Sequence, residues 1–311
     1  MSSSDDFIRP FQIEAAGLRG RLVRLGPALE RIVGGHDYPD AVAQMVGQAT
    51  ALSTLLATAL KFDGVFTLQT KGDGPISMLV ADFTSPGRLR AFAQFDQERL
   101  DTVLAEFGAE SDSVPRLMGG GYIAFTVDQG PETERYQGIV ALEGASLADC
   151  AHAYFRESEQ LETALVVAAQ RVENGGERQW RAGGLMLQRL PEGDPSLIAR
   201  GAEFERSEYS EDAWRRAVSF LASAQRGELT DPDLPADDLL FRLFHEDGVR
   251  VFEPQPLAFG CRCSGDRAVT VLRSLTAEER ADLRIDGRYV VKCEFCAAEY
   301  AYSEEDLNAP A

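Results

Sequence analysis

Two short cysteine motifs near the C-terminus, Cys261-Arg262-Cys263 and Cys293-Glu294-Phe295-Cys296, decide the fold of that part of the chain. They contain four of the five cysteines, and 29 residues separate them. Each motif can place two sulfur atoms on one side of a metal ion, so together they match a tetrahedral four-cysteine zinc site. The gap is long enough for a small helix and a turn that bring the second motif back to the first.

Other roles for these cysteines fit the sequence less well. Cysteines that only fill a core do not cluster in this way. Structural disulfides are typical of secreted proteins, but the chain begins with the polar stretch Met1-Ser2-Ser3-Ser4-Asp5-Asp6, which lacks the apolar segment of a signal peptide. We therefore expect a cytoplasmic protein whose thiols bind a metal, react with oxidants, or do both.

The chain is strongly acidic, which argues against nucleic acid as a partner. Its 311 residues include 50 acidic and 31 basic side chains, a formal net charge of −19. The region from Pro256 to Ala311 has seven basic and ten acidic residues, a net charge of −3, whereas a zinc ribbon that binds nucleic acid should be basic. No run of 18 or more apolar residues occurs, so we also expect no membrane-spanning helix.

Length and residue pattern divide the chain into three parts and predict an α+β fold. Residues 1–201 alternate predicted helices and strands without regular βαβ spacing, which indicates a mixed α+β domain. Its clearest helix is predicted over Asp40 to Leu60 and its clearest strand over Val65 to Thr70. Residues 256–311 should form a small zinc-binding domain, of a size at which a metal often becomes necessary for folding.

Residues 202–255 between these two parts should form a helical linker. Trp214, Val218 and Leu221 fall on one stripe of a predicted helix. The stretch from Gly227 to Pro235 that follows is polar and interrupted by proline. Such a segment is too short and broken to have a core of its own. We therefore expect a linker of low local stability that docks on another part of the protein.

The sequence contains no convincing catalytic site. Gly72-Asp73-Gly74 and Gly119-Gly120-Gly121 match neither a P-loop nor a dinucleotide-binding motif, so we interpret both as turns. Cys150 and His152 lie two residues apart in a predicted helix, where they face different directions. Cys150 is then a small core residue, and we expect no enzymatic activity.

The cysteine motifs, taken with other stretches in the same order, closely resemble the heat shock protein 33 family of redox-regulated bacterial chaperones. The resemblance covers most of the chain. The Cys-x-Cys and Cys-x-x-Cys pair at the C-terminus is its most specific part. The other matching stretches are Lys71-Gly72-Asp73-Gly74-Pro75, the segment from Tyr154-Phe155 to Ser158-Glu159-Gln160-Leu161, and Leu240-Phe241-Arg242-Leu243-Phe244-His245-Glu246.

This resemblance implies a cytoplasmic, ATP-independent holdase that binds unfolding proteins during oxidative stress. It implies one zinc ion held by Cys261, Cys263, Cys293 and Cys296 in the reduced and inactive protein. On oxidation, Cys261–Cys263 and Cys293–Cys296 disulfides should form and release the zinc. The active form should be a homodimer that binds unfolded or partially folded clients, with no nucleic acid or membrane partner.

Elementary chemistry supports such a switch. Zinc holds cysteines as thiolates, the form that oxidants attack, and a small zinc domain derives about 10 kcal/mol of folding free energy from its metal. Whole domains are stable by only about 5–15 kcal/mol, so a loss of this size is enough to release a weakly stable linker. The helix that carries Trp214, Val218 and Leu221 would then dissociate from the surface on which it packs. Either the linker or the surface it uncovers could bind clients.

Two alternatives remain open from the sequence. The first is a structural zinc knuckle on a protein-binding or transcription-type module without redox switching. The second is a thiol–disulfide oxidoreductase that uses Cys293 and Cys296. The second fits less well, because this motif follows a predicted strand and lacks the helix N-terminus that lowers a thiol pKa in such enzymes.

Overall fold

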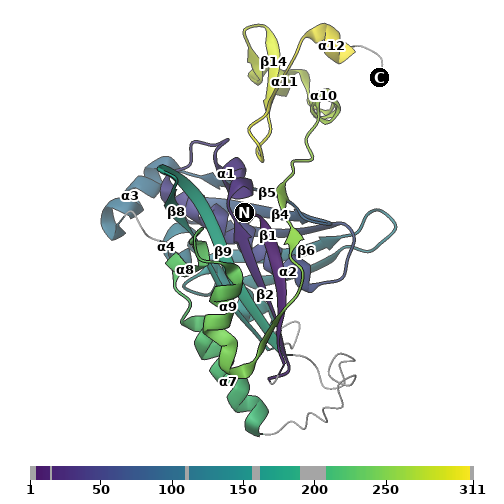
Figure 1. The fold of residues 1–311 in the computed structure, drawn as a ribbon. Coiled ribbons are helices and arrows are strands. Elements are labelled where there is room, and N and C mark those ends of the chain that lie inside the picture. The colour runs from purple at the N-terminus through teal and green to yellow at the C-terminus, as the bar shows by residue number, and fades with distance from the viewer. Residues whose placement is uncertain (1–4, 15, 109–111, 156–161, 190–207, 309–311) are drawn as a thin grey trace.

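The computed structural model describes residues 5–14, 16–108, 112–155, 162–189 and 208–308. Two six-stranded sheets form the body of the protein, and a small domain that carries the four cysteines stands at one end of it (Figure 1). Helix α2 (Asp40–Ala59) packs against both sheets, and 17 of its 20 residues are buried. The predicted α+β class is confirmed.

The first sheet has the strand order β10-β1-β2-β9-β8, and a further short strand, β11, pairs with β1. One face packs on α2, and the other carries the linker helices. Helix α1 (Pro27–Val33) packs against this sheet through β9. The strands are β1 Phe7–Ile13, β2 Leu18–Leu25, β8 Thr163–Asn174, β9 Glu177–Arg189, β10 Val249–Val251 and β11 Gln255–Pro256.

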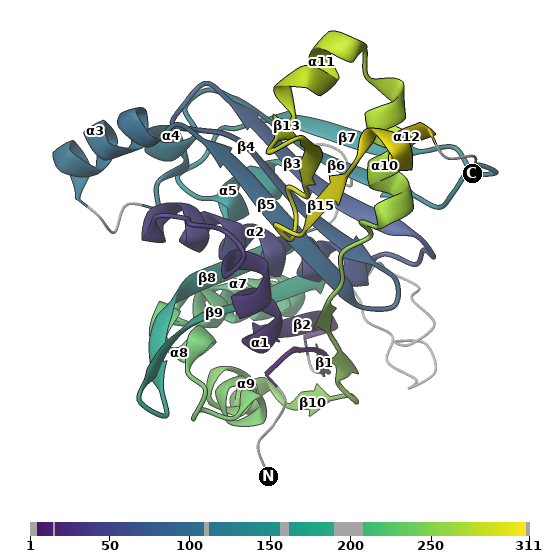
Figure 2. The ribbon, with the colours of Figure 1, turned by 90° about the horizontal axis from the view of Figure 1, so that it is seen from above.

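The second sheet has the order β12-β5-β4-β3-β6-β7, and every pairing is antiparallel except that of β12 with β5. Its inner face packs on α2, and the cysteine domain lies over the outer face (Figure 2). The strands are β3 Val65–Gly72, β4 Ile76–Thr84, β5 Arg88–Phe95, β6 Gly121–Asp128, β7 Tyr136–Ala141 and β12 Ala258–Phe259. The helices beside it are α3 Gln97–Phe107, α4 Val114–Leu117 and α5 Leu147–Tyr154.

Local sequence signals located the long elements well. The predicted helix over Asp40 to Leu60 is α2, and the strand predicted over Val65 to Thr70 is β3. Helices α1 and α3 were not predicted. Helix α3 has one buried residue, Leu100, so it offers almost no apolar stripe to detect.

The linker folds into three helices that cover the outer face of the first sheet. They are α7 Glu208–Ala222, α8 Arg226–Thr230 and α9 Ala236–Phe244, followed by a 3₁₀ turn at His245–Asp247. Residues from both partners share one apolar cluster. The sheet contributes Phe11, Ile13, Leu18, Leu22, Ala164, Ala168, Leu185 and Leu187, and the helices contribute Ala213, Ala217, Leu221, Leu229, Leu239, Leu240, Leu243 and Phe244.

The polar, proline-interrupted stretch from Gly227 to Pro235 contains most of helix α8. A capping box between Gln225 and Glu228 starts this helix, and Leu229 anchors it in the shared cluster. After α9 the chain adds β10 and β11 to the first sheet and then β12 to the second. The end of the linker is thus joined to the first sheet by backbone pairing as well as by apolar contact, and the residues that directly follow it pair with the second sheet.

The cysteine domain, residues 260–308, has a small apolar core. Only Leu272, Tyr289 and Leu307 form its buried cluster among the described residues. A capping box between Thr276 and Glu279 starts α11, the small helix expected between the two cysteine motifs, and α10 is an additional helix. The elements are α10 Gly265–Ser274, α11 Ala277–Asp282, β13 Arg284–Ile285, β14 Arg288–Lys292, β15 Glu299–Tyr302 and α12 Glu304–Asn308.

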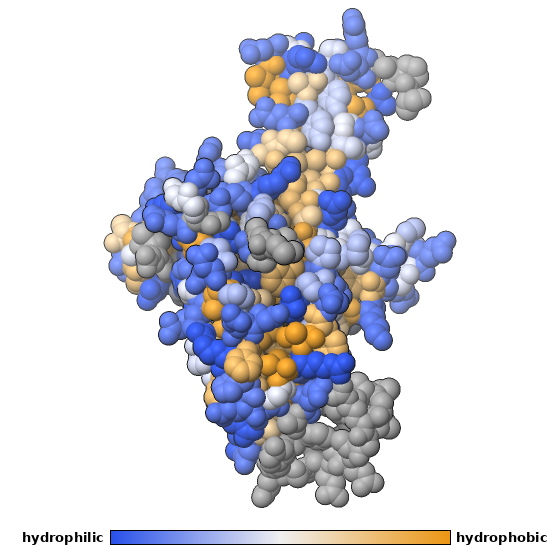
Figure 3. All heavy atoms as spheres, in the orientation of Figure 1, coloured by the Kyte–Doolittle hydropathy of each residue, from blue (hydrophilic) through white to orange (hydrophobic). Residues whose placement is uncertain are grey.

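The surface of the protein is mostly polar on the side that Figure 3 draws. The face in Figure 3 is largely hydrophilic, with apolar residues gathered along the connection to the cysteine domain and on the body below it. None of the helices within the described residues is both long and apolar enough to cross a membrane.

Candidate metal centre

The four cysteines of the two motifs converge on one point. Their Sγ atoms all lie within 4.8 Å of one another. Cys261 Sγ is 3.7 Å from Cys293 Sγ, and Cys263 Sγ is 3.4 Å from Cys296 Sγ. Sulfur atoms bound tetrahedrally to one zinc ion at about 2.3 Å lie about 3.8 Å apart. The cluster therefore has the donor atoms and the spacing that one tetrahedral metal ion requires.

Short turns place the sulfur atoms. The first motif lies between β12 and the N-cap of α10, and the second forms a tight turn between β14 and β15. In this turn the Cys293 N–H donates to the Ala298 carbonyl at 2.9 Å, and the Ala297 N–H donates to the Cys293 carbonyl at 2.8 Å. Ala297 adopts a left-handed φ of 55°, which closes the turn.

The thiols influence one another's ionisation. Burial raises the pKa of Cys261, but hydrogen bonds from the Cys263 backbone and from the neighbouring thiols outweigh it and bring that pKa down to about 7. Burial raises the pKa of Cys293 and of Cys296. One thiolate stabilised by its neighbours is a ready starting point for metal binding, which requires deprotonated sulfur.

Tyr300 on β15 lies against the cluster. Its hydroxyl donates a hydrogen bond to Cys263 Sγ at 3.2 Å, and this bond raises the pKa of Tyr300 to about 12. A donor that holds a ligand atom in place supports metal binding from outside the ligand set. Sequence reasoning missed Tyr300, because its contact with the cluster depends on the pairing of β14 with β15.

The residue inside the Cys-x-Cys motif connects the cluster to the second sheet. Arg262 Nη2 lies 2.6 Å from Asp82 Oδ2, and the Asp82 side chain on β4 is only 3% exposed. The same carboxylate accepts hydrogen bonds from Thr67 at 2.6 Å and from Arg90 at 2.8 Å. Asp82 is thus a buried acceptor with three donors, one of which belongs to the cysteine domain.

The residues inside the Cys-x-x-Cys motif contact β5. The Phe295 ring meets the Phe92 ring edge-to-face at 4.6 Å between centroids, and the Arg90 guanidinium lies 3.7 Å from the Phe295 centroid. Gln94 donates to the Glu294 carboxylate at 2.9 Å. In both cysteine motifs the cysteine side chains therefore point to the cluster, and the side chains between them contact the second sheet.

Comparison with known proteins identifies the architecture. A protein-family model described as "Hsp33 protein" matches residues 6–303. The chain belongs to the Hsp33 family. A 33 kDa chaperonin of Caulobacter vibrioides is 41% identical over 300 residues, which cover 95% of this chain and 94% of the relative. Another, from Ectopseudomonas mendocina, is 35% identical over 305 residues, 97% of this chain and 94% of the relative.

A solved structure supports the fold. The crystal structure of the Thermotoga maritima 33 kDa chaperonin, titled a heat shock protein 33 homologue, superposes with a TM-score of 0.74. The match covers 97% of this chain and 96% of the other at 22% identity. The protein is accordingly an Hsp33-family chaperone, a class defined by the binding of client proteins.

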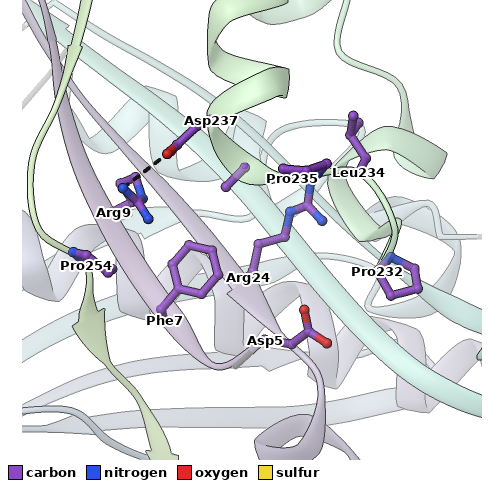
Figure 4. Close-up of a pocket in the computed structure, with 10 residues that line it drawn as sticks. Asp5, Phe7, Arg9, Arg24, Pro232, Leu234, Pro235, Asp237 and Pro254 are labelled. Atoms are coloured by element: carbon purple, nitrogen blue, oxygen red, sulfur yellow. Dashed lines mark ion pairs between the residues drawn. The ribbon is translucent and has the colours of Figure 1, made fainter. Parts of the chain in front are cut away.

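The linker of this Hsp33-family chain is fastened by buried polar contacts besides its apolar cluster. Arg24 on β2 donates to the carbonyls of Asp231 and of Glu228, the latter at 2.9 Å. Burial lowers the pKa of Arg24. Figure 4 shows this side chain in a cavity of about 330 Å³ between β1, β2 and the start of α9, where Arg9 pairs with Asp237 at 3.3 Å.

The linker residues predicted from sequence lie on the docked face. Leu221 is 2% exposed, and Trp214 and Val218 are partly buried against the same apolar cluster. Their part in client binding remains a prediction. The boundary expected at 201/202 and the matching stretch Ser158-Glu159-Gln160-Leu161 lie outside the described residues.

The remaining candidates are separate from the cluster. Cys150 is fully buried in the main core, and burial raises its pKa to about 11. His152, two residues later, is exposed, so the two side chains face different directions as predicted. Gly72-Asp73-Gly74 connects β3 and β4, where the Asp73 carboxylate accepts from the Gly120 N–H at 2.8 Å. Both glycine stretches form part of one turn structure.

Proposed function

We propose that this protein is a zinc-dependent, redox-regulated and ATP-independent holdase of the cytoplasm, without enzymatic activity. One observation carries the proposal. Arg262 and Phe295, which lie between the cysteines, make the contacts that dock the cysteine domain on the second sheet. Any change in how the cysteines are bonded is therefore transmitted directly to the docking contacts.

Cys261, Cys263, Cys293 and Cys296 are the proposed ligands of one zinc ion in the reduced protein. Four thiols at tetrahedral spacing fit this ion, and bound zinc would neutralise thiolate charge and stabilise the fold. The domain has only three residues in its buried cluster, so about 10 kcal/mol of metal-binding free energy would dominate its stability.

We propose that oxidation pairs the cysteines within each motif, Cys261 with Cys263 and Cys293 with Cys296. With peroxide as the oxidant, one thiolate attacks an oxygen, forms a sulfenic acid and releases hydroxide. The second thiolate then attacks the sulfenic sulfur and releases a second hydroxide. The two sulfurs lose two electrons, which peroxide accepts. Each disulfide removes two ligands, so the cluster can no longer hold a metal ion.

Loss of the cluster would release the chain segments before Cys261 one after another, starting with the strand next to the cysteines and ending with the linker helices. Strand β12, two residues long, pairs with β5 immediately before Cys261, and β11 and β10 precede it. These short pairings have little stability without the docked domain. Release of α7, α8 and α9 would then expose the apolar outer face of the first sheet, including Phe11, Leu22 and Leu185. Large exposed apolar faces mark protein–protein interaction sites, so this face would bind unfolded clients and support the proposed homodimer.

The test measures zinc and client binding together. Peroxide should release one zinc per chain to a chromophoric chelator and should switch on suppression of client aggregation. Light scattering should show a dimer in the same samples. A Cys150→Ala variant, which lacks only the buried fifth cysteine, should switch as the wild type does.

Two outcomes would reject the switch. Equal suppression of aggregation by the reduced, zinc-loaded protein would show that activity does not depend on oxidation. Zinc retained after complete peroxide treatment would favour the alternative of a structural zinc knuckle. Insulin reduction by the protein would instead support an oxidoreductase based on Cys293 and Cys296.

A further inference from the structure

The outer face of β5 carries a buried aromatic side chain that does not belong to any core. Phe92 is 5% exposed, yet it is absent from all three apolar clusters of the described residues. Its neighbours Ala91 and Ala93 both lie in the main core. Because alternate residues of a strand face opposite sides, Phe92 points to the outer face, where Phe295 covers it.

Three successive outward positions of β5, Arg90, Phe92 and Gln94, form what we call the aromatic seat. Arg90 lies over one side of the Phe295 ring and Phe92 meets the ring edge-to-face. Gln94 donates to the carboxylate of the preceding residue, Glu294. The seat thus recognises an aromatic ring and, beside it, a carboxylate.

The seat is built into the sheet and does not depend on the cysteine domain for its shape. Asp82 on β4 holds Arg90 by two contacts, at 2.8 Å to Nε and 2.7 Å to Nη2. Thr67 on β3 holds Asp82 from the other side. When Arg262 leaves, Asp82 keeps its contacts with Arg90, so the guanidinium stays in position for another aromatic ring.

We propose that the aromatic seat binds extended client segments in which an aromatic residue follows an acidic one, and that Glu294-Phe295 occupies it as a built-in competitor in the docked state. This inference rests on the proposed holdase function and names a client feature for it. Aromatic side chains are buried in native proteins and become available on unfolding. The stacked cation and the ring edge favour an aromatic ring over an aliphatic side chain of similar size.

The test uses unstructured fluorescent 12-residue peptides that differ only in their central dipeptide, binding to full-length protein. Oxidised, zinc-free protein should bind Glu-Phe about tenfold more tightly than Glu-Leu, since the cation and ring contacts are lost with leucine. Reduced, zinc-loaded protein should bind neither. Phe295→Ala removes the competitor while keeping all four cysteines, so it should bind the Glu-Phe peptide even when reduced.

Two variants locate the site. Phe92→Ala should abolish the preference for Glu-Phe without unfolding the body, because Phe92 lies outside the core clusters. Gln94→Glu should reverse the preference from Glu-Phe towards Lys-Phe. The matched control is Phe107→Ala on α3, which removes an exposed aromatic ring that also stacks with an arginine, Arg116, at 4.3 Å.

The outcomes separate this inference from the proposed function. If oxidised protein suppresses aggregation but binds Glu-Phe and Glu-Leu equally, or if Phe92→Ala leaves Glu-Phe binding unchanged, the aromatic seat is refuted and the holdase stands. If oxidised protein does not suppress aggregation, the redox holdase is refuted. In that case the reduced Phe295→Ala protein still decides whether the seat binds the peptide.

Discussion

Replacing Asp82 with asparagine should separate docking of the cysteine domain from metal binding. The substitution preserves shape but removes the charge that Arg262 and Arg90 share. A hydrogen bond between charged partners contributes about 1.5–3 kcal/mol when it is buried. The Arg262 side chain is 35% exposed, so solvent screening reduces its share to about 1–2 kcal/mol. The undocked population should therefore rise about 5- to 30-fold.

Hydrogen exchange provides the assay. Amide protons in and next to β12, such as the Ala258 N–H that donates to the Gly87 carbonyl at 2.9 Å and the Gly260 N–H that donates to the Leu89 carbonyl at 2.8 Å, should exchange faster in Asp82→Asn by that factor. Zinc affinity, measured by chelator competition, should stay within about twofold of wild type. The control is Asp40→Asn, which removes a partner of Arg171 in an exposed pair at 3.2 Å.

A second variant tests the same contact without changing the buried Asp82 side chain. Arg262→Gln removes the same contact from the other side and leaves the Asp82 bonds to Thr67 and Arg90 intact. In a double-mutant cycle the two substitutions should couple by about 1–2 kcal/mol. Additive effects, or a fall in zinc affinity that parallels the loss of exchange protection, would refute the claim that this contact docks the domain.

Three further predictions concern the linker and the cluster. A Cβ at Gly183 on β9 would overlap the backbone carbonyl of Leu229 in α8. Gly183→Ala should therefore displace α8 and give the reduced protein holdase activity at unchanged zinc affinity. The control is Gly227→Ala, where a Cβ meets nothing within 4 Å and no effect is expected. Tyr300→Phe removes the hydrogen bond to Cys263 and should weaken zinc affinity about tenfold, as measured by chelator competition. Unchanged zinc affinity would contradict a supporting role for Tyr300. Chelation of zinc under reducing conditions should unfold the cysteine domain but spare strands β1 to β9 of the two sheets, as measured by hydrogen exchange. Protection that persists throughout residues 265–308 would mean that the small core suffices.

Local patterns in the sequence were sufficient for the cysteine cluster and for the long elements of the body. Cysteine spacing predicts a shared site because ligands on short turns must converge on one ion, and the four Sγ atoms do lie together. The continuous burial of α2 follows from its run of alanine, leucine, valine and methionine. The stripe of Trp214, Val218 and Leu221 likewise predicted a docked helix, because its 3.6-residue period is a local property.

Local sequence patterns could not predict the contacts that the linker and the cysteine domain make with the two sheets. Strands β10, β11 and β12 are two or three residues long, too short for an alternating pattern, and their partners lie about 170 to 250 residues away in sequence. The seat of Phe295 on β5 depends on the register of that strand with β4, which places Arg90 beside Asp82. Phe295 is half-buried against Phe92 and Arg90, and no local pattern in the Cys-x-x-Cys motif indicates that this turn has such a partner.

The arrangement of the Cys-x-Cys motif makes Arg262 the first point at which oxidation should act. Cys261 and Cys263 direct their sulfur atoms to the cluster, while Arg262 between them points to Asp82. A disulfide within this motif requires the two sulfur atoms to approach to about 2.05 Å, with Cβ atoms about 3.8 Å apart. Because the two cysteines flank a single residue, we expect that approach to change the backbone dihedrals at Arg262. The guanidinium would then leave an acceptor to which it is bound at 2.6 Å, so under the proposed oxidation we expect undocking to begin inside the ligand loop itself.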